Sequence, residues 1–231
     1  MTALALDLRG PLAVVAGAFN PAIFTTSWIA TNIFDIPVGA EMSVLEALVQ
    51  VDPQTLLRLG FIEGIALNAT ASRLELFAVN GEASTFDALE RALVKLLELL
   101  PHTTVGGLGC NFRWIDSDPS PDAIDRFDSA EGLEGKFPVA VRQFSAQVQL
   151  DGQVLNLARA SIGSEVHYSF NYHRTVTDAA QCASMLQGML TADLVHSTQM
   201  MADLYGYHEH TTLAFGGDDI EEIVDAAENT D

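Results

Sequence analysis

Two tight turns in the second half of the chain divide residues 139–173 into three segments that fit one antiparallel sheet. In residues 143–150, polar and apolar side chains alternate, which is typical of a half-buried strand. Asp151-Gly152 predicts a two-residue hairpin turn after this strand, and Gly163-Ser164 predicts a second turn. The sequence therefore predicts a three-stranded β-meander.

The registers set by these turns bring the apolar side chains of all three strands to one face. The first turn pairs Val148 with Leu155, and the second sets Leu157 opposite Phe170. A shift of one residue in either hairpin would destroy this agreement, because neighbouring side chains point to opposite faces. The shared apolar face comprises Phe144, Ala146, Val148, Leu150, Leu155, Leu157, Val166, Tyr168, Phe170 and Tyr172.

Helical periodicity predicts two long amphipathic helices. Asp178 is a suitable N-cap for a helix over residues 179–205, whose apolar stripe includes Leu190 and Leu204. A second stripe, rich in leucine, runs along residues 85–100. We expect the first of these helices to cover one face of the meander.

The first half of the chain contains a related order of elements. Residues 57–68 and 73–79 predict a hairpin ahead of the leucine-rich helix, and residues 103–114 predict a strand after it. Residues 42–51 are rich in Leu, Ala and Glu and predict a further helix. The expected fold is α+β, with antiparallel hairpins and a meander packed against long amphipathic helices, and the order is compatible with two similar halves.

Changes in composition predict four segments. An N-terminal α+β half covers residues 1–115, and an acidic connector covers residues 116–136. The meander and its long helix cover residues 137–215, and an acidic tail covers residues 216–231.

The charge balance excludes some classes of partner. The chain has 31 acidic and 11 basic residues, a net charge of −20. Direct nucleic-acid binding needs several convergent cations, and anionic membrane surfaces also attract cations, so we expect neither partner. The start of the chain has no signal-peptide pattern, and two cysteines are too few for a disulfide framework. We therefore expect a cytoplasmic protein in which Cys110 and Cys182 are small buried apolar residues.

No residue is predicted to be catalytic, and no cofactor is predicted. The sequence has neither a nucleophile-elbow motif nor a phosphate-binding loop, because Gly106, Gly107 and Gly109 lack the required spacing. In a strand, such glycines favour close approach by another backbone or by a large side chain.

His208-Glu209-His210 is the densest group of metal-ligating side chains. In a strand, His208 and His210 would share one face, as zinc ligands can. The sequence offers no third ligand at a recognised spacing, so two ordinary exposed histidines are the alternative.

The polar face of the meander presents amide and imidazole side chains that could bind a ligand or a protein. A solvated sheet face has the same pattern. Arg159 falls on the apolar face opposite Tyr168, where it could stack on an aromatic ring or recognise a carboxylate. The predicted ligand-binding residues are Arg159, His167 and His173.

The acidic tail has two interpretations. It is either a frayed, solubilising end or a short acidic helix that docks on a basic partner. In the second case the partner-binding residues are Ile220, Ile223 and Val224, which recur at helical spacing.

Two functional hypotheses follow. The first is a non-catalytic intracellular binding or assembly protein that acts through protein–protein contacts, either with a basic partner or with further copies of itself. The alternative is a small-molecule-binding protein or enzyme with a pocket between the meander and the long helix.

Overall fold

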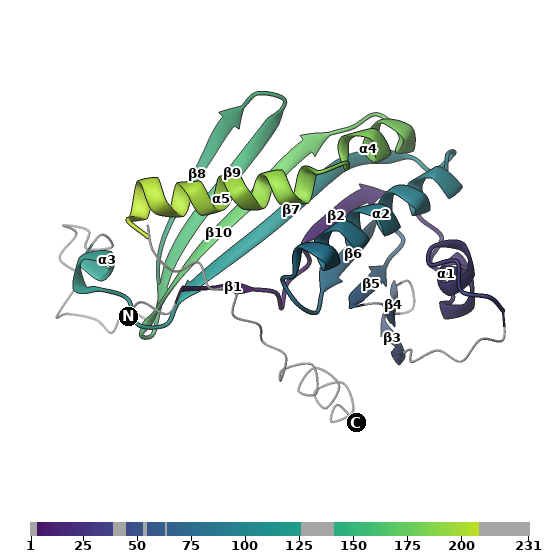
Figure 1. Ribbon diagram of the computed structural model, residues 1–231, viewed down its shortest axis with the longest axis horizontal. Helices are drawn as coiled ribbons and strands as arrows, with labels where there is room; N and C mark the ends of the chain where they lie inside the picture. Colours follow the sequence, from purple (N-terminus) through teal and green to yellow (C-terminus); the bar gives the residue numbers. More distant parts are fainter. Residues whose placement is uncertain (1–3, 39–44, 53–54, 63, 126–140, 208–231) are drawn as a thin grey trace.

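The computed structural model describes residues 4–38, 45–52, 55–62, 64–125 and 141–207 (Figure 1). The helices are η1 (Pro21–Ile23), α1 (Thr26–Asn32), α2 (Ala83–Leu99), α3 (Pro121–Asp125), α4 (Ala179–Met185) and α5 (Met189–Tyr205). The strands are β1 (Leu4–Asp7), β2 (Ala13–Gly17), β3 (Leu45–Asp52), β4 (Thr55–Ile62), β5 (Ile65–Ala69), β6 (Arg73–Ala78), β7 (Val105–Asp116), β8 (Val141–Leu150), β9 (Gln153–Ile162) and β10 (Glu165–Thr175).

All ten strands that the structure describes belong to one open antiparallel sheet. Its order is β3-β4-β5-β6-β2-β7-β10-β9-β8, and β1 pairs with the free end of β7 beyond β2. The fold is α+β, as the sequence predicts.

The two halves have a similar order of elements on either side of the central β2–β7 pair, with one more strand in the first half. The first half runs from β2 through the short helix α1 and the strands β3 to β6 into the long helix α2. The second runs from β7 through the short helix α3 and the strands β8 to β10 into α4 and α5. In the sheet, β6 flanks β2 as β10 flanks β7, so the arrangement has an approximate twofold symmetry.

The C-terminal meander has the register predicted from its turns. Leu150 pairs with Gln153 and Ile162 pairs with Glu165 at the two turns. Farther along the strands, Leu157 lies opposite Phe170. Gly152 and Gly163 have φ angles of 72° and 60°, in the left-handed region that these tight turns require.

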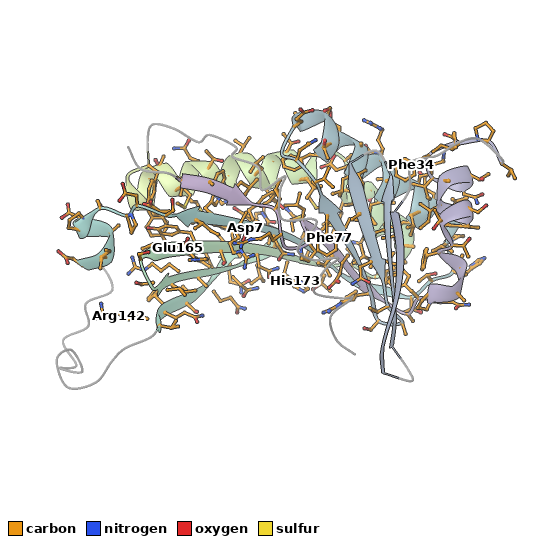
Figure 2. All side chains as sticks on the ribbon, turned by 90° about the horizontal axis from the view of Figure 1, so that it is seen from below. Asp7, Phe34, Phe77, Arg142, Glu165 and His173 are labelled. Atoms are coloured by element: carbon orange, nitrogen blue, oxygen red, sulfur yellow. The ribbon has the colours of Figure 1, made fainter. Side chains whose placement is uncertain are left out.

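The long helices cover only one face of the sheet. Figure 1 shows α2 over β6 and β2, and α5 over β7 and the meander. Figure 2 shows the helical layer above the sheet and His173 below it. The apolar core lies between these two layers, and the opposite face of the C-terminal meander and β7 is called the open face below.

Three local predictions are wrong. Residues 57–68, predicted as one arm of a hairpin, are divided between β4 and β5, which pair with each other. Residues 45–52 form the strand β3 instead of part of a helix, and its backbone pairs with β4. The helix predicted over residues 179–205 is divided into α4 and α5 at Gly188, whose φ of 71° lies outside the helical region. This division lets the chain turn, so that α4 packs on α2 while α5 crosses the meander.

The two halves are also joined in the helical layer by Glu90 of α2. Its buried carboxylate accepts hydrogen bonds from the backbone N–H groups of Gly188 (2.8 Å) and Leu190 (2.5 Å) at the start of α5. The first N–H groups of a helix have no partner within the helix. Glu90 therefore caps α5 from the other half of the molecule.

We expect Glu90→Ala to lower the free energy of unfolding by about 2 kcal/mol, because it leaves two backbone N–H groups without their partner. Urea denaturation followed by circular dichroism measures this loss. Glu98→Ala removes an exposed acid from the same helix and is expected to change stability by less than about 0.5 kcal/mol. Equal losses in the two variants would show that the capping bonds contribute nothing.

Candidate functional site

The three residues predicted to bind a ligand do not converge. Arg159 lies on the helix-covered face, with its guanidinium carbon 5.2 Å from the centre of the Phe144 ring. His167 and His173 lie on the open face, since they alternate along β10 with side chains buried under the helices. His167 contacts Glu165 at 2.8 Å, and His173 is exposed. One pocket cannot be lined by all three.

The space between the meander and α5 is filled by side chains. Trp114 and Tyr168 are among the largest fully buried residues. The Trp114 indole donates a hydrogen bond to Ser197 of α5 (3.3 Å), and the Tyr168 ring lies with its centre 4.6 Å from that of Tyr205. The protein's own core therefore occupies the place where a ligand pocket is predicted.

A buried ion pair lies in this core. The guanidinium of Arg174 donates two hydrogen bonds to the carboxylate of Asp193, at 2.8 and 2.7 Å. Arg174 is 9% exposed and Asp193 is 3% exposed. The bidentate geometry satisfies both oxygens of the carboxylate, which an interior position requires. The pair joins β10 to α5, and its surroundings give it a structural role.

The buried thiols and phenols near the core are poor nucleophiles. Burial and the nearby charge of Asp193 raise the pKa of Cys110 well above its ordinary value, and burial raises the pKa of Cys182 to about 12. Burial also raises the pKa of Tyr172, and of Tyr207, whose hydroxyl donates to Asp116 (2.5 Å). Since the thiolate is the reactive form of cysteine, neither thiol suits nucleophilic catalysis. Both cysteines are buried and unpaired, as predicted.

The open face carries a continuous line of side-chain amides across four strands. Gln147 of β8 donates to Asn156 of β9 (2.9 Å), and Asn156 donates to Asn171 of β10 (2.9 Å). Asn171 donates to Asn111 of β7, and Asn111 donates to the backbone carbonyl of Pro11 (3.0 Å). We call the four amides Gln147, Asn156, Asn171 and Asn111 the amide ladder.

Three members of the ladder were visible in the sequence as polar positions of the meander. Asn111 was not, because it lies in the glycine-rich strand of the first half. The register that sets it opposite Asn171 joins β7 to β10 over 60 residues of sequence. No local turn encodes that register.

The ladder is flanked by a charged group on β1 and β7. Asp7 pairs with Arg113 and accepts hydrogen bonds from the backbone and side chain of Arg9 (3.0 and 2.8 Å). Burial acts to raise the pKa of Asp7, but the bonds from Arg9 and the charges of Arg113 and Arg9 outweigh it and lower that pKa. The carboxylate therefore stays ionised and holds both arginines beside the ladder.

At another point next to the ladder, the absence of a side chain at Gly107 lets the ring of His173 lie against the sheet. A Cβ atom at Gly107 would lie 3.2 Å from Cε1 of His173, tighter than ordinary van der Waals contact. This contact confirms the predicted close approach at Gly107, whereas a Cβ atom at Gly106 would meet no atom within 4 Å and one at Gly109 would make only ordinary contacts. His173 therefore packs against Gly107 on the open face, beside the ladder.

Several predicted sites lie outside the described residues. These are the metal ligands His208 and His210, and the tail residues Ile220, Ile223 and Val224. Among the side chains that are described, no group of three or more His, Cys, Asp or Glu is placed to hold a metal ion. No helix within the described ranges is long and apolar enough to cross a membrane.

The candidate site is therefore the open face around the amide ladder, a surface suited to hydrogen bonding. Comparison of the sequence with protein-family models and with curated proteins finds no match.

Proposed function

We propose that this chain is a non-catalytic cytoplasmic binding protein, and that its open face receives a basic protein. The observation that carries the proposal is the division of the sheet. One face is covered by helices over a packed core (Figure 2), while the other presents the amide ladder.

The ladder suits a binding surface because its amides are held before a partner arrives. Each side-chain amide has two N–H donors and a carbonyl oxygen that accepts two bonds, so one bond to each neighbour leaves further capacity. Asn156 and Asn171 are fixed by bonds on both sides. A partner that contacts them loses little additional side-chain entropy, which favours binding.

The charge of the whole molecule selects the class of partner. A net charge of −20 attracts cationic surfaces and repels nucleic acids and anionic membranes over several ångströms of solution. Arginine and lysine are donors only, and the amide carbonyls of the ladder can accept from them. The function proposed is thus the binding of a protein that has more basic than acidic residues.

Site-specific photo-crosslinking in the native host tests this proposal. A photo-reactive amino acid at Ser169, on the open face, is expected to give an adduct with one basic protein, identified by mass spectrometry. The control position is Val195, which is 63% exposed on α5 and belongs to the helical layer.

With the purified partner, we expect Asn156→Ala to weaken binding about tenfold and a rise in salt to weaken it further. Isothermal titration calorimetry measures both effects. Adducts of equal yield from Ser169 and Val195, or affinity that is independent of salt, would contradict the proposal.

A further inference from the structure

The outer edge of β8 is a second candidate binding surface, separate from the open face. β8 is the last strand in the sheet order, and β9 is the one described strand that pairs with it. It is ten residues long, and its pairing with β9 has no bulge or shift of register. Its backbone therefore offers a long, straight row of hydrogen-bonding groups at the edge.

Natural edge strands are usually protected by lysine, proline, bulges or short length. β8 has no lysine, proline, glycine or bulge, and Arg142 near its start is its one charged residue. Its helix-side residue Phe144 is 49% exposed, although the neighbouring strand buries Leu155 completely. An edge of this kind is suited to pairing with another strand.

We propose that the edge of β8 pairs antiparallel with β8 of a second copy of this chain, so that two sheets join into one. The distribution of charge favours a second copy of the chain at the edge of β8. Two molecules of net charge −20 repel each other, but residues 141–150 bring no acidic side chain to the contact. A symmetric strand pair also satisfies both edges with one interface.

The side chains select a pairing centred on Gln147. Opposite residues of an antiparallel pair share a face, so this centre sets Phe144 against Leu150 and Ala146 against Val148 on the helix side. Centres at Ala146 or Ser145 would set Arg142 against Leu150 or Val148, a charge against an apolar side chain. The centre at Gln147 places Arg142 beyond the partner's strand.

The same centre joins the two amide ladders. Gln147 donates inward to Asn156 (2.9 Å), so its second N–H and its carbonyl oxygen can bind a group across the edge. In the pair it meets Gln147 of the partner subunit, and the two amides can exchange hydrogen bonds. The ladder would then run without interruption from β7 of one subunit to β7 of the other.

Single-cysteine variants of the full chain test the register. Opposite Cα atoms are about 4.5–5.5 Å apart, within the span of a disulfide, so Gln147→Cys is expected to form a covalent dimer when oxidised with copper–phenanthroline in air. Ser145→Cys is the control, because its two copies would be four residues apart along the strands, about 14 Å. The native Cys110 and Cys182 are buried and do not compete. Equal cross-linking at both positions, or none at position 147, would overturn the pairing.

Introducing a charge at position 147 gives a second, independent test, in which the dimer is measured by sedimentation equilibrium. Gln147→Glu and Gln147→Lys each place like charges opposite each other, so both are expected to weaken the dimer about tenfold. If the affinity of the dimer depended only on net charge, Gln147→Lys would instead form a tighter dimer. Gln187→Glu, at an exposed position between α4 and α5, is the control and should leave the dimer unchanged.

Salt separates this inference from the proposed function. Screening of the −20 charges should tighten the dimer as salt rises, whereas binding of a basic protein should weaken. A chain that is monomeric at all salt concentrations overturns the β8 pairing and leaves the crosslinks from Ser169 unaffected.

Discussion

Asp193→Ala should lower the free energy of unfolding by about 3–5 kcal/mol, because it leaves the guanidinium of Arg174 buried without its counter-charge. Arg174 is 9% exposed and donates both of its short hydrogen bonds, at 2.7 and 2.8 Å, to this one carboxylate. The loss is measured by urea denaturation, with the fluorescence of buried Trp114 as the signal.

An exposed ion pair of equal length provides the control. Lys95 donates to Asp35 at 2.7 Å, but the Asp35 side chain is 83% exposed. Lys95→Ala should therefore cost less than about 1 kcal/mol. Similar losses for Lys95→Ala and Asp193→Ala would contradict the importance of burial.

The double variant Arg174→Met with Asp193→Leu separates charge from packing. It removes both charges and keeps apolar volume, so we expect it to recover most of the stability that Asp193→Ala loses. A double variant as unstable as the single one would show that the pair contributes through its shape rather than through its charge.

A loss of stability in alkali is the second large effect that we expect. The folded-state pKa of Cys182 is raised to about 12 from an ordinary value of 9.0. A raised pKa means that stability is complete below pH 9 and is lost as the pH rises towards the folded value, because the unfolded chain releases the proton first. Each pH unit in this window costs about 1.4 kcal/mol for the Cys182 thiol.

Cys110 adds to this slope above pH 9, and Tyr172 and Tyr207 add to it above pH 10, since burial raises the pKa of all three. Denaturation curves between pH 7 and pH 10.5 measure the slope. Cys182→Ala should make it shallower by about 1.4 kcal/mol per pH unit. An unchanged slope in that variant would refute the assignment to Cys182.

The C-terminal meander was predictable because its geometry is encoded locally. Turns at Gly152 and Gly163 set the pairing of their neighbours, and the apolar pattern allows one register. The pairing of β7 with β10 and β2 depends on contacts between distant segments. The sequence pattern therefore showed most of the polar face but not Asn111 or the order of the whole sheet.

Other features were missed because one pattern fits two structures. In residues 45–52 the odd positions are all apolar and the even positions are polar except Leu48, a pattern close to that of a strand, but the Leu, Ala and Glu content favours a helix. Arg174 stands next to His173 in the sequence and suggests a cationic surface, whereas the alternation of β10 turns the two side chains to opposite faces. Asp193 lies on the helix face that packs on the sheet, where an acidic residue gives no hint of its partner.

The contact of Glu90 with the start of α5 also has a consequence for folding during synthesis on the ribosome. The two backbone groups that Glu90 binds lie 98 and 100 residues downstream. Asn111 of β7 likewise bonds to Asn171 of β10, which is 60 residues downstream. Assembly therefore cannot follow the order of translation, since an element made early is completed by one made late. The nascent first half therefore stays incompletely folded until the second half is made, and Phe112 and Trp114 are not yet buried.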